Sequence, residues 1–135
     1  MKPVWPARGA ITSVFGNDNG RRHPGIDIGL LQSLAVRAAV PGRVILVGRA
    51  RGYEGYGNLV VVRTSKHQTE LYAHLAGYRV KRGQRVRAGQ RLGTAGCTGW
   101  CTGTHLHFEV RRNGRPVNPV RTVLREARMP ATWGG

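Results

Sequence analysis

The chain has 135 residues, of which 40% are hydrophobic, and this is enough for one domain with a single core. Its 22 Lys and Arg outnumber 6 Asp and Glu, so the formal net charge is +16 and a polyanionic partner is favoured. No apolar run approaches the roughly 18 residues of a transmembrane helix, so no such helix is expected.

Short strands joined by tight turns are predicted along most of the chain. Its 20 glycines and 7 prolines are spread through the sequence, which is typical of an all-β protein. The turn-rich segments 17–25 and 51–57 are expected to be loops, and the polar segment 64–69 a hairpin tip. In chain order, strands are predicted at residues 10–16, 26–28, 34–40, 43–47, 59–63, 70–75 and 105–111.

Residues 80–93 contain a short near-repeat, in which Val-x-x-Gly-Gln begins at Val80 and again at Val86. The six-residue step predicts that one tight β-turn is used twice. Biotinyl- and lipoyl-carrier domains contain similar hairpins, but they need a modifiable lysine at a hairpin tip. Lys81 is the one lysine of this segment and lies inside the first unit, so the carrier interpretation is disfavoured.

The C-terminal part is expected to hold one short helix. Asn118 and Pro119 suit the N-cap and first positions of a helix, which would run to about Ala127. We therefore expect residues 1–127 to form the domain and residues 128–135 to form a loose tail.

Two histidines near the C-terminus lie in one predicted strand. His105 and His107 are two positions apart, so both imidazoles project from the same face. Leu106 and Phe108 would fill the opposite, core face, and Glu109 would share the histidine face as a hydrogen-bond acceptor. A surface strand with two incidental histidines is the alternative.

His23 and Asp27 are separated by a Pro-Gly pair, which favours a turn entering a strand over a helix. Such a turn can fold the imidazole and the carboxylate around one ion, and nitrogen with oxygen donors suits zinc. An aspartate that caps a turn beside an exposed histidine is the alternative.

His74 lies in the predicted strand 70–75, where alternation places it on the same face as Tyr72. A structural role is the alternative for a single histidine of this kind. The remaining histidine, His67, lies at the polar hairpin tip and is expected to face solvent.

A catalytic zinc site has three protein ligands and one open position, whereas structural sites are closed by four ligands. His23, Asp27 and one histidine of the His105/His107 pair would supply three. The open position would hold a water whose pKa falls toward ~7. The remaining histidines could take its proton and stabilise the oxyanion. The sequence thus contains all the groups that metal-assisted amide hydrolysis requires.

The chain resembles the M23 family of zinc metallopeptidases, of the lysostaphin and LytM type, over roughly residues 8–120. The family's motifs occur in its order and with approximately its spacing, including His-x3-Asp, Leu-Tyr-Ala-His-Leu and His-x-His-Phe-Glu. The resemblance implies an all-β fold built on a twisted antiparallel β-sheet, with zinc in a groove lined by loops. The matching segments are 11–16, 23–28, 55–60, 71–75, 86–90, 96–99 and 102–110.

The resemblance also implies a role for each site residue. His23, Asp27 and His107 would be the zinc ligands. His74 and His105 would be catalytic histidines that do not bind the metal. The implied activity is endopeptidase cleavage of stem or cross-bridge peptides in bacterial peptidoglycan, with a zinc-bound water as the nucleophile.

Two segments depart from the family pattern. The usual Ser-Thr-Gly-Pro before His-x-His is Cys-Thr-Gly-Thr at residues 101–104, so the restraint of the proline is lost. Residues 30–34 fit the usual glycine-rich stretch after Asp27 poorly. Neither segment contains a proposed ligand, but both could alter the groove and so the choice of substrate.

Cys97 and Cys101 lie close to the His-x-His motif. Thiolate ligation is disfavoured, because two thiolates would close a site that already has three implied ligands. A disulfide that staples the turn is expected, with a stabilisation at the low end of ~2–4 kcal/mol because the loop is short. Two free buried thiols are the alternative.

Two other functions compete with the peptidase. A degenerate M23 domain would bind partners or activate another wall hydrolase, but such domains usually lose site residues and all five are present. A basic nucleic-acid-binding β-domain would be favoured by aromatic residues alternating with Lys and Arg, and no such stripe occurs among the 3 Trp, 4 Tyr and 2 Phe. We therefore expect no specific nucleic-acid partner.

The expected place of action is the cell wall, periplasm or extracellular space, where a monomer would meet peptidoglycan. The stretch from Met1 to Pro6 lacks the apolar core of a signal peptide. We therefore expect either a trimmed natural start or delivery without general export, as for a phage endolysin.

Overall fold

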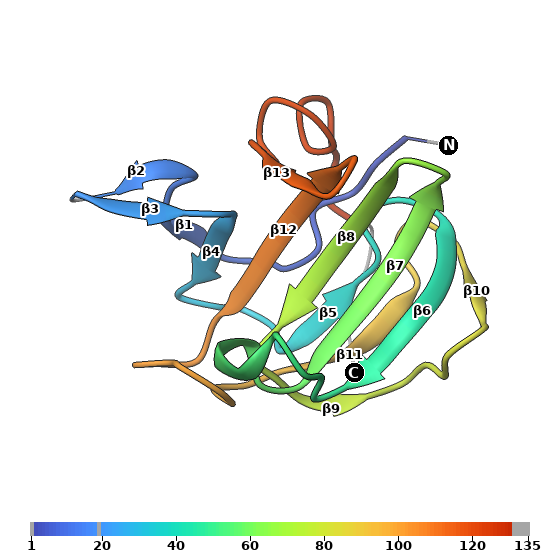
Figure 1. Ribbon diagram of the computed structural model, residues 1–135, viewed down its shortest axis with the longest axis horizontal. Coiled ribbons are helices and arrows are strands. Elements are labelled where there is room, and N and C mark those ends of the chain that lie inside the picture. The colour runs from blue at the N-terminus through green and yellow to red at the C-terminus, as the bar shows by residue number, and fades with distance from the viewer. Residues whose placement is uncertain (1, 19, 131–135) are drawn as a thin grey trace.

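The computed structural model describes residues 2–18 and 20–130 and shows an antiparallel β-fold (Figure 1). The all-β class predicted from the turn content is confirmed. Its elements are β1 (Ala10–Ser13), β2 (Gly16–Asp18), β3 (Arg21–His23), β4 (Ile26–Gly29), β5 (Ala35–Arg37), β6 (Gly42–Gly48), the 3-10 turn η1 (Glu54–Tyr56), β7 (Leu59–Ser65), β8 (Gln68–Ala73), β9 (Leu75–Tyr78), β10 (Arg85–Val86), β11 (Arg91–Ala95), β12 (Leu106–Arg112) and β13 (Arg115–Val117).

The largest sheet has the strand order β1-β4-β12-β8-β7-β6-β10, and β13 pairs with β12 beside this path. In Figure 1 its long strands β12, β8, β7 and β6 lie side by side. Residues 59–62 of β7, Leu-Val-Val-Val, are buried whichever face they point to, because an apolar cluster covers each face of the sheet here.

A second sheet, of order β5-β11-β9, contributes to the larger of the two apolar clusters. Val36 and Leu92 from this sheet belong to the same cluster as Tyr72 and Phe108 from the large sheet. The rings of Tyr72 and Phe108 lie 5.1 Å apart, and the Tyr72 hydroxyl accepts the N–H of Ala39 at 2.9 Å. Burying each large side chain of this kind stabilises the fold by about 1.5–3 kcal/mol, so this main core holds the two sheets together.

Strand β12 follows the alternation predicted for it. Leu106, Phe108 and Val110 are fully buried in the main core. His107 and Glu109 project from the opposite face, where they hydrogen-bond to each other. The polar groups of the strand therefore gather on the face of the sheet that looks away from the main core.

The expectation of a loop over residues 17–25 is wrong for most of that segment. Strands β2 and β3 form an antiparallel hairpin in which Gly16 pairs with His23, and Figure 1 shows it projecting away from the sheets. The turn-forming residues serve the tip of the hairpin instead. Asn17 Oδ1 accepts the N–H of Gly20 at 3.0 Å, and Gly20 has a φ of 80°.

The helix expected from Asn118 to Ala127 is absent, and consecutive turns take its place. The predicted cap does form, because Asn118 Oδ1 accepts the N–H of Val120 at 3.0 Å. The bonds that follow do not have the four-residue span of an α-helix; the N–H of Leu124, for example, donates to the carbonyl of Pro119. Three β-branched residues in the four positions after Pro119 disfavour helical propagation.

The near-repeat of residues 80–93 forms two equivalent turns, as predicted. Gln84 Oε1 accepts the N–H of Lys81 at 3.1 Å, and Gln90 repeats this bond with Arg87 at the same distance. The glycine before each glutamine has a positive φ, 93° and 86°, which explains the glycine in the repeat.

The first residues of the described chain pair with the last. Val4 and Arg128 form an isolated parallel bridge, and the N–H of Trp5 donates to the carbonyl of Arg128 at 3.0 Å. The tail expected at 128–135 therefore begins with an ordered residue, and its positions 131–135 lie outside the described residues. Within the described part of the chain, no helix has the length and apolar character needed to cross a membrane.

Candidate metal and catalytic site

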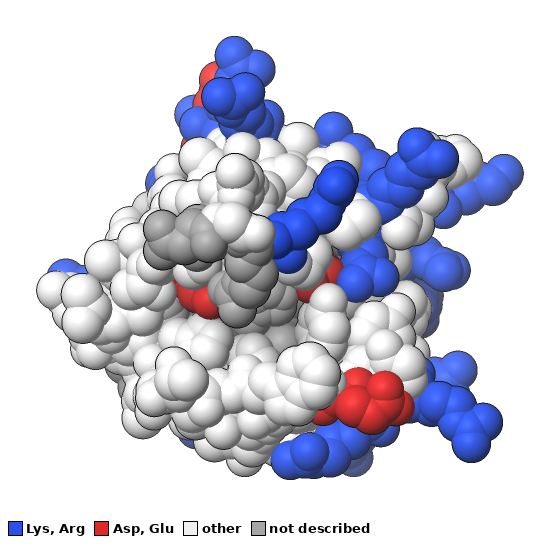
Figure 2. All heavy atoms as spheres, turned by 60° about the vertical axis from the view of Figure 1, so that its left-hand side comes forward, with Lys and Arg blue, Asp and Glu red and all other residues white. Residues whose placement is uncertain are grey.

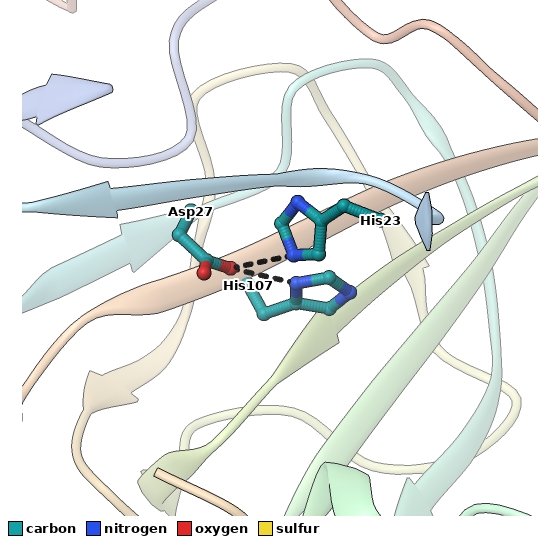
Figure 3. Close-up of side chains that lie close together, drawn as sticks. All are labelled: His23, Asp27 and His107. Atoms are coloured by element: carbon teal, nitrogen blue, oxygen red, sulfur yellow. Dashed lines mark hydrogen bonds and ion pairs between the residues drawn. The ribbon is translucent and has the colours of Figure 1, made fainter. Parts of the chain in front are cut away.

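The three proposed metal ligands come together on the face of the large sheet opposite the main core. His23 ends β3, Asp27 lies in β4, and His107 lies in β12 directly opposite Asp27. Figure 3 shows the three side chains pointing toward one another. Their candidate ligand atoms all lie within 4.8 Å of one another. Strand pairing thus brings together groups from distant parts of the chain.

The donor types and their spacing fit one four-coordinate metal ion. Imidazole nitrogens and a carboxylate oxygen bind zinc at about 2.0–2.2 Å, so the ligand atoms of a tetrahedral site lie roughly 3.3 Å apart. His23 Nε2 lies 3.4 Å from Asp27 Oδ1. His107 Nδ1 lies 2.7 Å from the same oxygen, the distance of a direct hydrogen bond, so these two groups must separate slightly to admit an ion.

Hydrogen-bond partners determine which ring nitrogen of each histidine faces the centre. His23 Nδ1 donates to the carbonyl of Val14 at 3.0 Å, which leaves Nε2 for a metal. His107 Nε2 donates to Glu109 Oε1 at 2.8 Å, which leaves Nδ1. A carboxylate behind a ligand histidine fixes the ring and makes it a stronger donor to a metal. The prediction that Glu109 shares the histidine face is confirmed.

Two residues that the sequence did not single out hold Glu109. This carboxylate is fully buried and accepts hydrogen bonds from the Tyr56 hydroxyl and, at 3.0 Å, from Arg111 Nε. Burial raises the pKa of Glu109, but the hydrogen bonds from His107 and Tyr56 and the nearby positive charges outweigh it and lower the pKa below its usual value. Arg111 continues the alternation of His107 and Glu109, so the pattern could have revealed it, whereas Tyr56 has no comparable signal.

His74 reaches the site through a break in its strand. Tyr72 is buried in the main core, whereas His74 lines the groove on the other face, so the shared face predicted for these two residues is wrong. The backbone of His74 has a φ of 64°, a left-handed conformation. It follows the last residue of β8, Ala73, and interrupts the two-residue alternation, which sends the imidazole to the opposite face.

His74 and His105 present the same ring nitrogen to the groove. His74 Nδ1 donates to the carbonyl of Thr98 at 2.6 Å, and His105 Nδ1 donates to the carbonyl of Gly103 at 2.7 Å. With Nδ1 carrying the proton, the lone pair of an imidazole is on Nε2. The two ring centroids are 4.8 Å apart, and His105 Nε2 lies 3.7 Å from Asp27 Oδ1. Burial lowers the pKa of His74 below its usual value, although its bond to Thr98 acts in the opposite direction, and the net effect favours the neutral imidazole.

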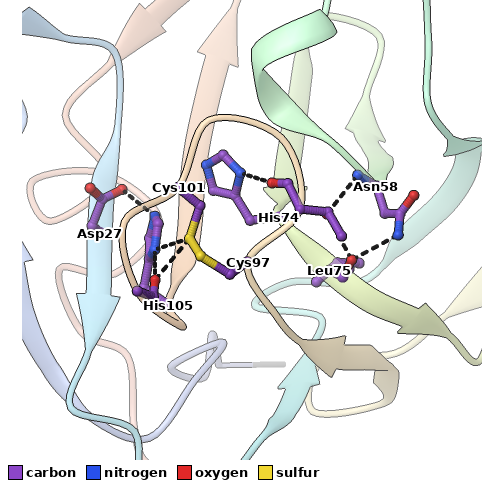
Figure 4. Close-up of a disulfide and its surroundings, with 9 residues drawn as sticks. Asp27, Asn58, His74, Leu75, Cys97, Cys101 and His105 are labelled. Atoms are coloured by element: carbon purple, nitrogen blue, oxygen red, sulfur yellow. Dashed lines mark hydrogen bonds and ion pairs between the residues drawn. A yellow bond between two sulfur atoms is a disulfide. The ribbon is translucent and has the colours of Figure 1, made fainter.

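Two further predictions concern residues that are not proposed as metal ligands or catalytic groups. His67 is exposed at the hairpin between β7 and β8, as predicted. Cys97 and Cys101 form a disulfide with 5.3 Å between their Cα atoms, which confirms the predicted bridge (Figure 4). The two sulfurs are therefore bonded to each other and are not thiolate ligands.

The site opens into a groove whose described lining residues include no basic side chain. Besides the five site residues, its lining includes Pro24, Tyr53, Glu54, Trp100 and Thr102. Among the described residues that line it there is no Lys or Arg, although the chain contains 22 of them. Figure 2 shows most of the basic side chains of one face around its top, right-hand and lower edges, while the surface around the hollow at its centre is mainly uncharged. Anionic polymers would therefore be attracted to the surroundings of the groove.

The titration of His107 links the site to pH. Burial lowers the pKa of His107, but its hydrogen bonds and the charges of Asp27 and Glu109 raise it to about 9. The same hydrogen bond lowers the pKa of Asp27, against the effect of burial. Because the folded value exceeds the ordinary value of 6.5, this proton stabilises the metal-free fold below pH 6.5, and the contribution is lost as pH rises through about 9.

Metal binding should therefore release a proton from His107. We expect about one proton per ion bound at pH 7, and an apparent affinity that falls roughly tenfold for each pH unit below the pKa. Titration calorimetry in two buffers of different ionisation enthalpy gives the proton count. Binding without proton release would show that the ion does not replace the proton on Nδ1.

Comparison with known proteins extends these observations. The model of peptidase family M23 matches residues 21–119. The chain is 39% identical over 117 residues to the murein hydrolase activator NlpD of Escherichia coli, and 44% identical over 104 residues to the DD-carboxypeptidase/endopeptidase Mpg of Neisseria meningitidis. These matches cover 87% and 77% of this chain but 30% and 23% of those proteins, so the chain corresponds to only a part of each.

Solved structures show the same fold. A mutant catalytic domain of the prophage-encoded M23 protein EnpA from Enterococcus faecalis matches with a TM-score of 0.77 and 31% identity, over 99% of this chain and 98% of that one. A zinc-containing peptidase from Vibrio cholerae matches with a TM-score of 0.75 and 34% identity, over 96% of this chain and 40% of that one. The family model spans most of the chain and includes all three candidate metal donors, so this protein belongs to peptidase family M23.

Proposed function

We propose that this protein is a zinc-dependent endopeptidase that cleaves the stem or cross-bridge peptides of bacterial peptidoglycan. The observation that carries the proposal is the convergence of three metal donors and two further histidines in one groove. Similarity to a murein hydrolase activator and to a DD-carboxypeptidase/endopeptidase supports peptidoglycan as the target. Similarity to a zinc-containing peptidase supports zinc as the metal.

His23, Asp27 and His107 are the residues that would hold the zinc ion. When bound, zinc supplies a Lewis acid that polarises the scissile carbonyl and lowers the pKa of a water toward ~7. The chain contributes the orientation of the donors, because the carbonyl of Val14 and the carboxylate of Glu109 each accept a hydrogen bond from the far side of a donor ring.

His74 and His105 are proposed to move protons without binding the metal. Each presents the lone pair of Nε2 to the groove because its Nδ1 donates to a backbone carbonyl. A neutral imidazole in this position accepts the proton of the attacking water. Once protonated, it donates to the oxyanion or to the leaving amine.

The proposed place of action is the cell wall, periplasm or extracellular space, with the protein acting as a monomer. Its net charge of +16 favours attraction to the carboxylates and phosphates of a wall. On the large sheet, Arg43 lies directly opposite Arg85 on one side and Arg63 on the other. Like charges in such cross-strand pairs repel each other, so an anionic polymer bound along this row would relieve the repulsion.

The likeness to NlpD favours a second candidate function, in which the domain activates another wall hydrolase and cuts nothing itself. The two candidates differ in what they require of the site. An activator needs a surface for its partner, whereas a peptidase needs metal donors and proton-transfer groups in one place. The grouping of all five site residues in the groove favours the peptidase.

Digestion of purified peptidoglycans of different cross-bridge types, followed by mass analysis of the fragments, tests the proposal. We expect new peptide ends whose formation stops with a chelator and returns with added zinc. The variant His67→Ala, changed at the exposed hairpin tip, is the control and should cut at the normal rate. Intact peptides with every wall type, together with stimulation of a second wall hydrolase, would establish the activator instead.

A further inference from the structure

A short loop contacts both of the proposed proton-transfer histidines. Cys97 and Cys101 close this loop with a disulfide, and Figure 4 shows the bridge between His105 and His74. Inside the loop, the carbonyl of Thr98 accepts a hydrogen bond from His74 Nδ1 at 2.6 Å. At its other end, the sulfur of Cys101 lies 3.5 Å from His105 Nδ1. The two histidines come from different segments, so the loop connects them physically.

The side chain of Thr98 fixes the carbonyl that orients His74. Its hydroxyl donates to the carbonyl of Leu75 at 2.9 Å and accepts the N–H of Asn58 at 3.0 Å. Asn58 Nδ2 donates to the same Leu75 carbonyl at 2.9 Å. Thr98, whose carbonyl accepts the hydrogen bond from His74, is thus bonded to Leu75, the residue that directly follows His74.

The loop gains little support from burial. The side chain of Trp100, its largest residue, is 84% exposed. Besides the hydrogen bonds of the Thr98 side chain, the loop lies close to residues 55–57: the N–H of Trp100 donates to the carbonyl of Gly55 at 2.9 Å, and a β-carbon on Gly57 would collide with the backbone of Thr98. The disulfide is therefore the covalent restraint that limits how far these contacts can loosen.

We propose that the disulfide between Cys97 and Cys101 is a positioning element for catalysis, which holds the Thr98 carbonyl and through it the ring of His74. The inference rests on the proposed peptidase function, but the bond between His74 and Thr98 can be observed without activity. Opening the bridge loosens the loop and lets the ring turn away from the reacting groups. The metal donors lie on β3, β4 and β12, outside the loop, so metal binding is retained.

Reduction of the zinc-loaded protein with a phosphine tests this inference. One phosphine and one water convert the disulfide into two thiols and a phosphine oxide, and no thiol reagent is present to compete for zinc. We expect kcat to fall by ~10–10²-fold with KM and zinc content unchanged, because misplacement of a catalytic group by about 1 Å has an effect of this size. Reoxidation should restore kcat.

The double variant Cys97→Ser/Cys101→Ser is the matched control for the reagent. It should show the same loss of kcat as the reduced protein and should not respond to the phosphine. Thr98→Val, which removes the hydroxyl and leaves the disulfide intact, should also lower kcat. Thr98→Ser, which restores the hydroxyl, should recover it.

Nuclear magnetic resonance of the imidazole protons separates this inference from the proposed function. The Nδ1 proton of His74 should give a slowly exchanging signal in the oxidised protein and lose it on reduction, whether or not the protein hydrolyses peptides. An unchanged signal, or an unchanged kcat after complete reduction, would overturn the positioning role. A rise in KM alone, or loss of zinc, would also overturn it, because the loop would then contact substrate or support the metal site.

Discussion

In His107→Ala, bound zinc should fall from about one ion per chain to almost none, and hydrolysis should be lost with it. The substitution leaves His23 and Asp27 as the remaining members of the donor cluster, two where a catalytic zinc has three. It also removes the imidazole that bonds to Glu109, although Arg111 still pairs with that carboxylate. Elemental analysis after dialysis measures the metal, and release of peptide fragments measures turnover.

The neighbouring variant His105→Ala should keep its zinc and lose about 10²–10⁴-fold in turnover. His105 lies near the cluster, with Nε2 3.7 Å from Asp27 Oδ1, but its ring is oriented by the carbonyl of Gly103 and it lies outside the group of three donors. The pair of variants therefore tests the assignment directly. If His105→Ala loses zinc while His107→Ala keeps it, the two roles are reversed, and if both keep zinc, the third donor is another residue.

The strands that could be predicted are those with a clear pattern of apolar and polar residues along their own sequence. The apolar run from Leu59 and the alternation around His107 predict β7 and β12 closely. A strand that is buried on both faces has a continuous apolar run, whereas a strand that is buried on one face alternates apolar and polar residues. The hairpin of β2 and β3 could not be told from a loop, because Asn and Gly mark both a loop and a hairpin tip. A good cap at Asn118 predicts where a helix can start, but it does not decide whether the residues that follow will continue it.

The geometry of the site depended on long-range pairing. Residue types and motifs indicated the donors, but the contact of His107 with Asp27 requires β4 to lie beside β12, and no local pattern encodes that neighbour. Glu109 and Arg111 follow from alternation along β12. Tyr56 comes from the 3-10 turn η1, 53 residues before Glu109 in the chain, so its contact with that carboxylate is also a long-range one.

His74 is the site residue for which the local rule gave the wrong face. Alternation assumes extended backbone, and nothing in Leu-Tyr-Ala-His-Leu marks the left-handed conformation that His74 adopts with a φ of 64°. That conformation allows the chain to leave β8 and pair again as β9 while the imidazole turns into the groove. The backbone of His74 therefore matters to the site as well as its ring, and a test of the ring must leave the backbone undisturbed.

The variant His74→Asn meets this condition and should keep its zinc while turnover falls by about 10²–10⁴-fold. Asparagine tolerates left-handed backbone better than most residues, so the turn after β8 should survive, but its amide cannot accept and return a proton. The exposed His67→Asn is the matched control and should retain full activity. A loss of less than about tenfold, or loss of zinc, would contradict the proposed role of His74.

The same variant also shows through which residue the disulfide acts. If the bridge between Cys97 and Cys101 serves catalysis by orienting His74, then a protein that lacks this imidazole has little left to lose when the bridge is reduced. We therefore expect the phosphine to lower kcat much less in His74→Asn than in the unchanged protein, which is the non-additivity of two changes in one network. Equal losses in the two proteins would mean that the loop acts on His105, its other histidine contact.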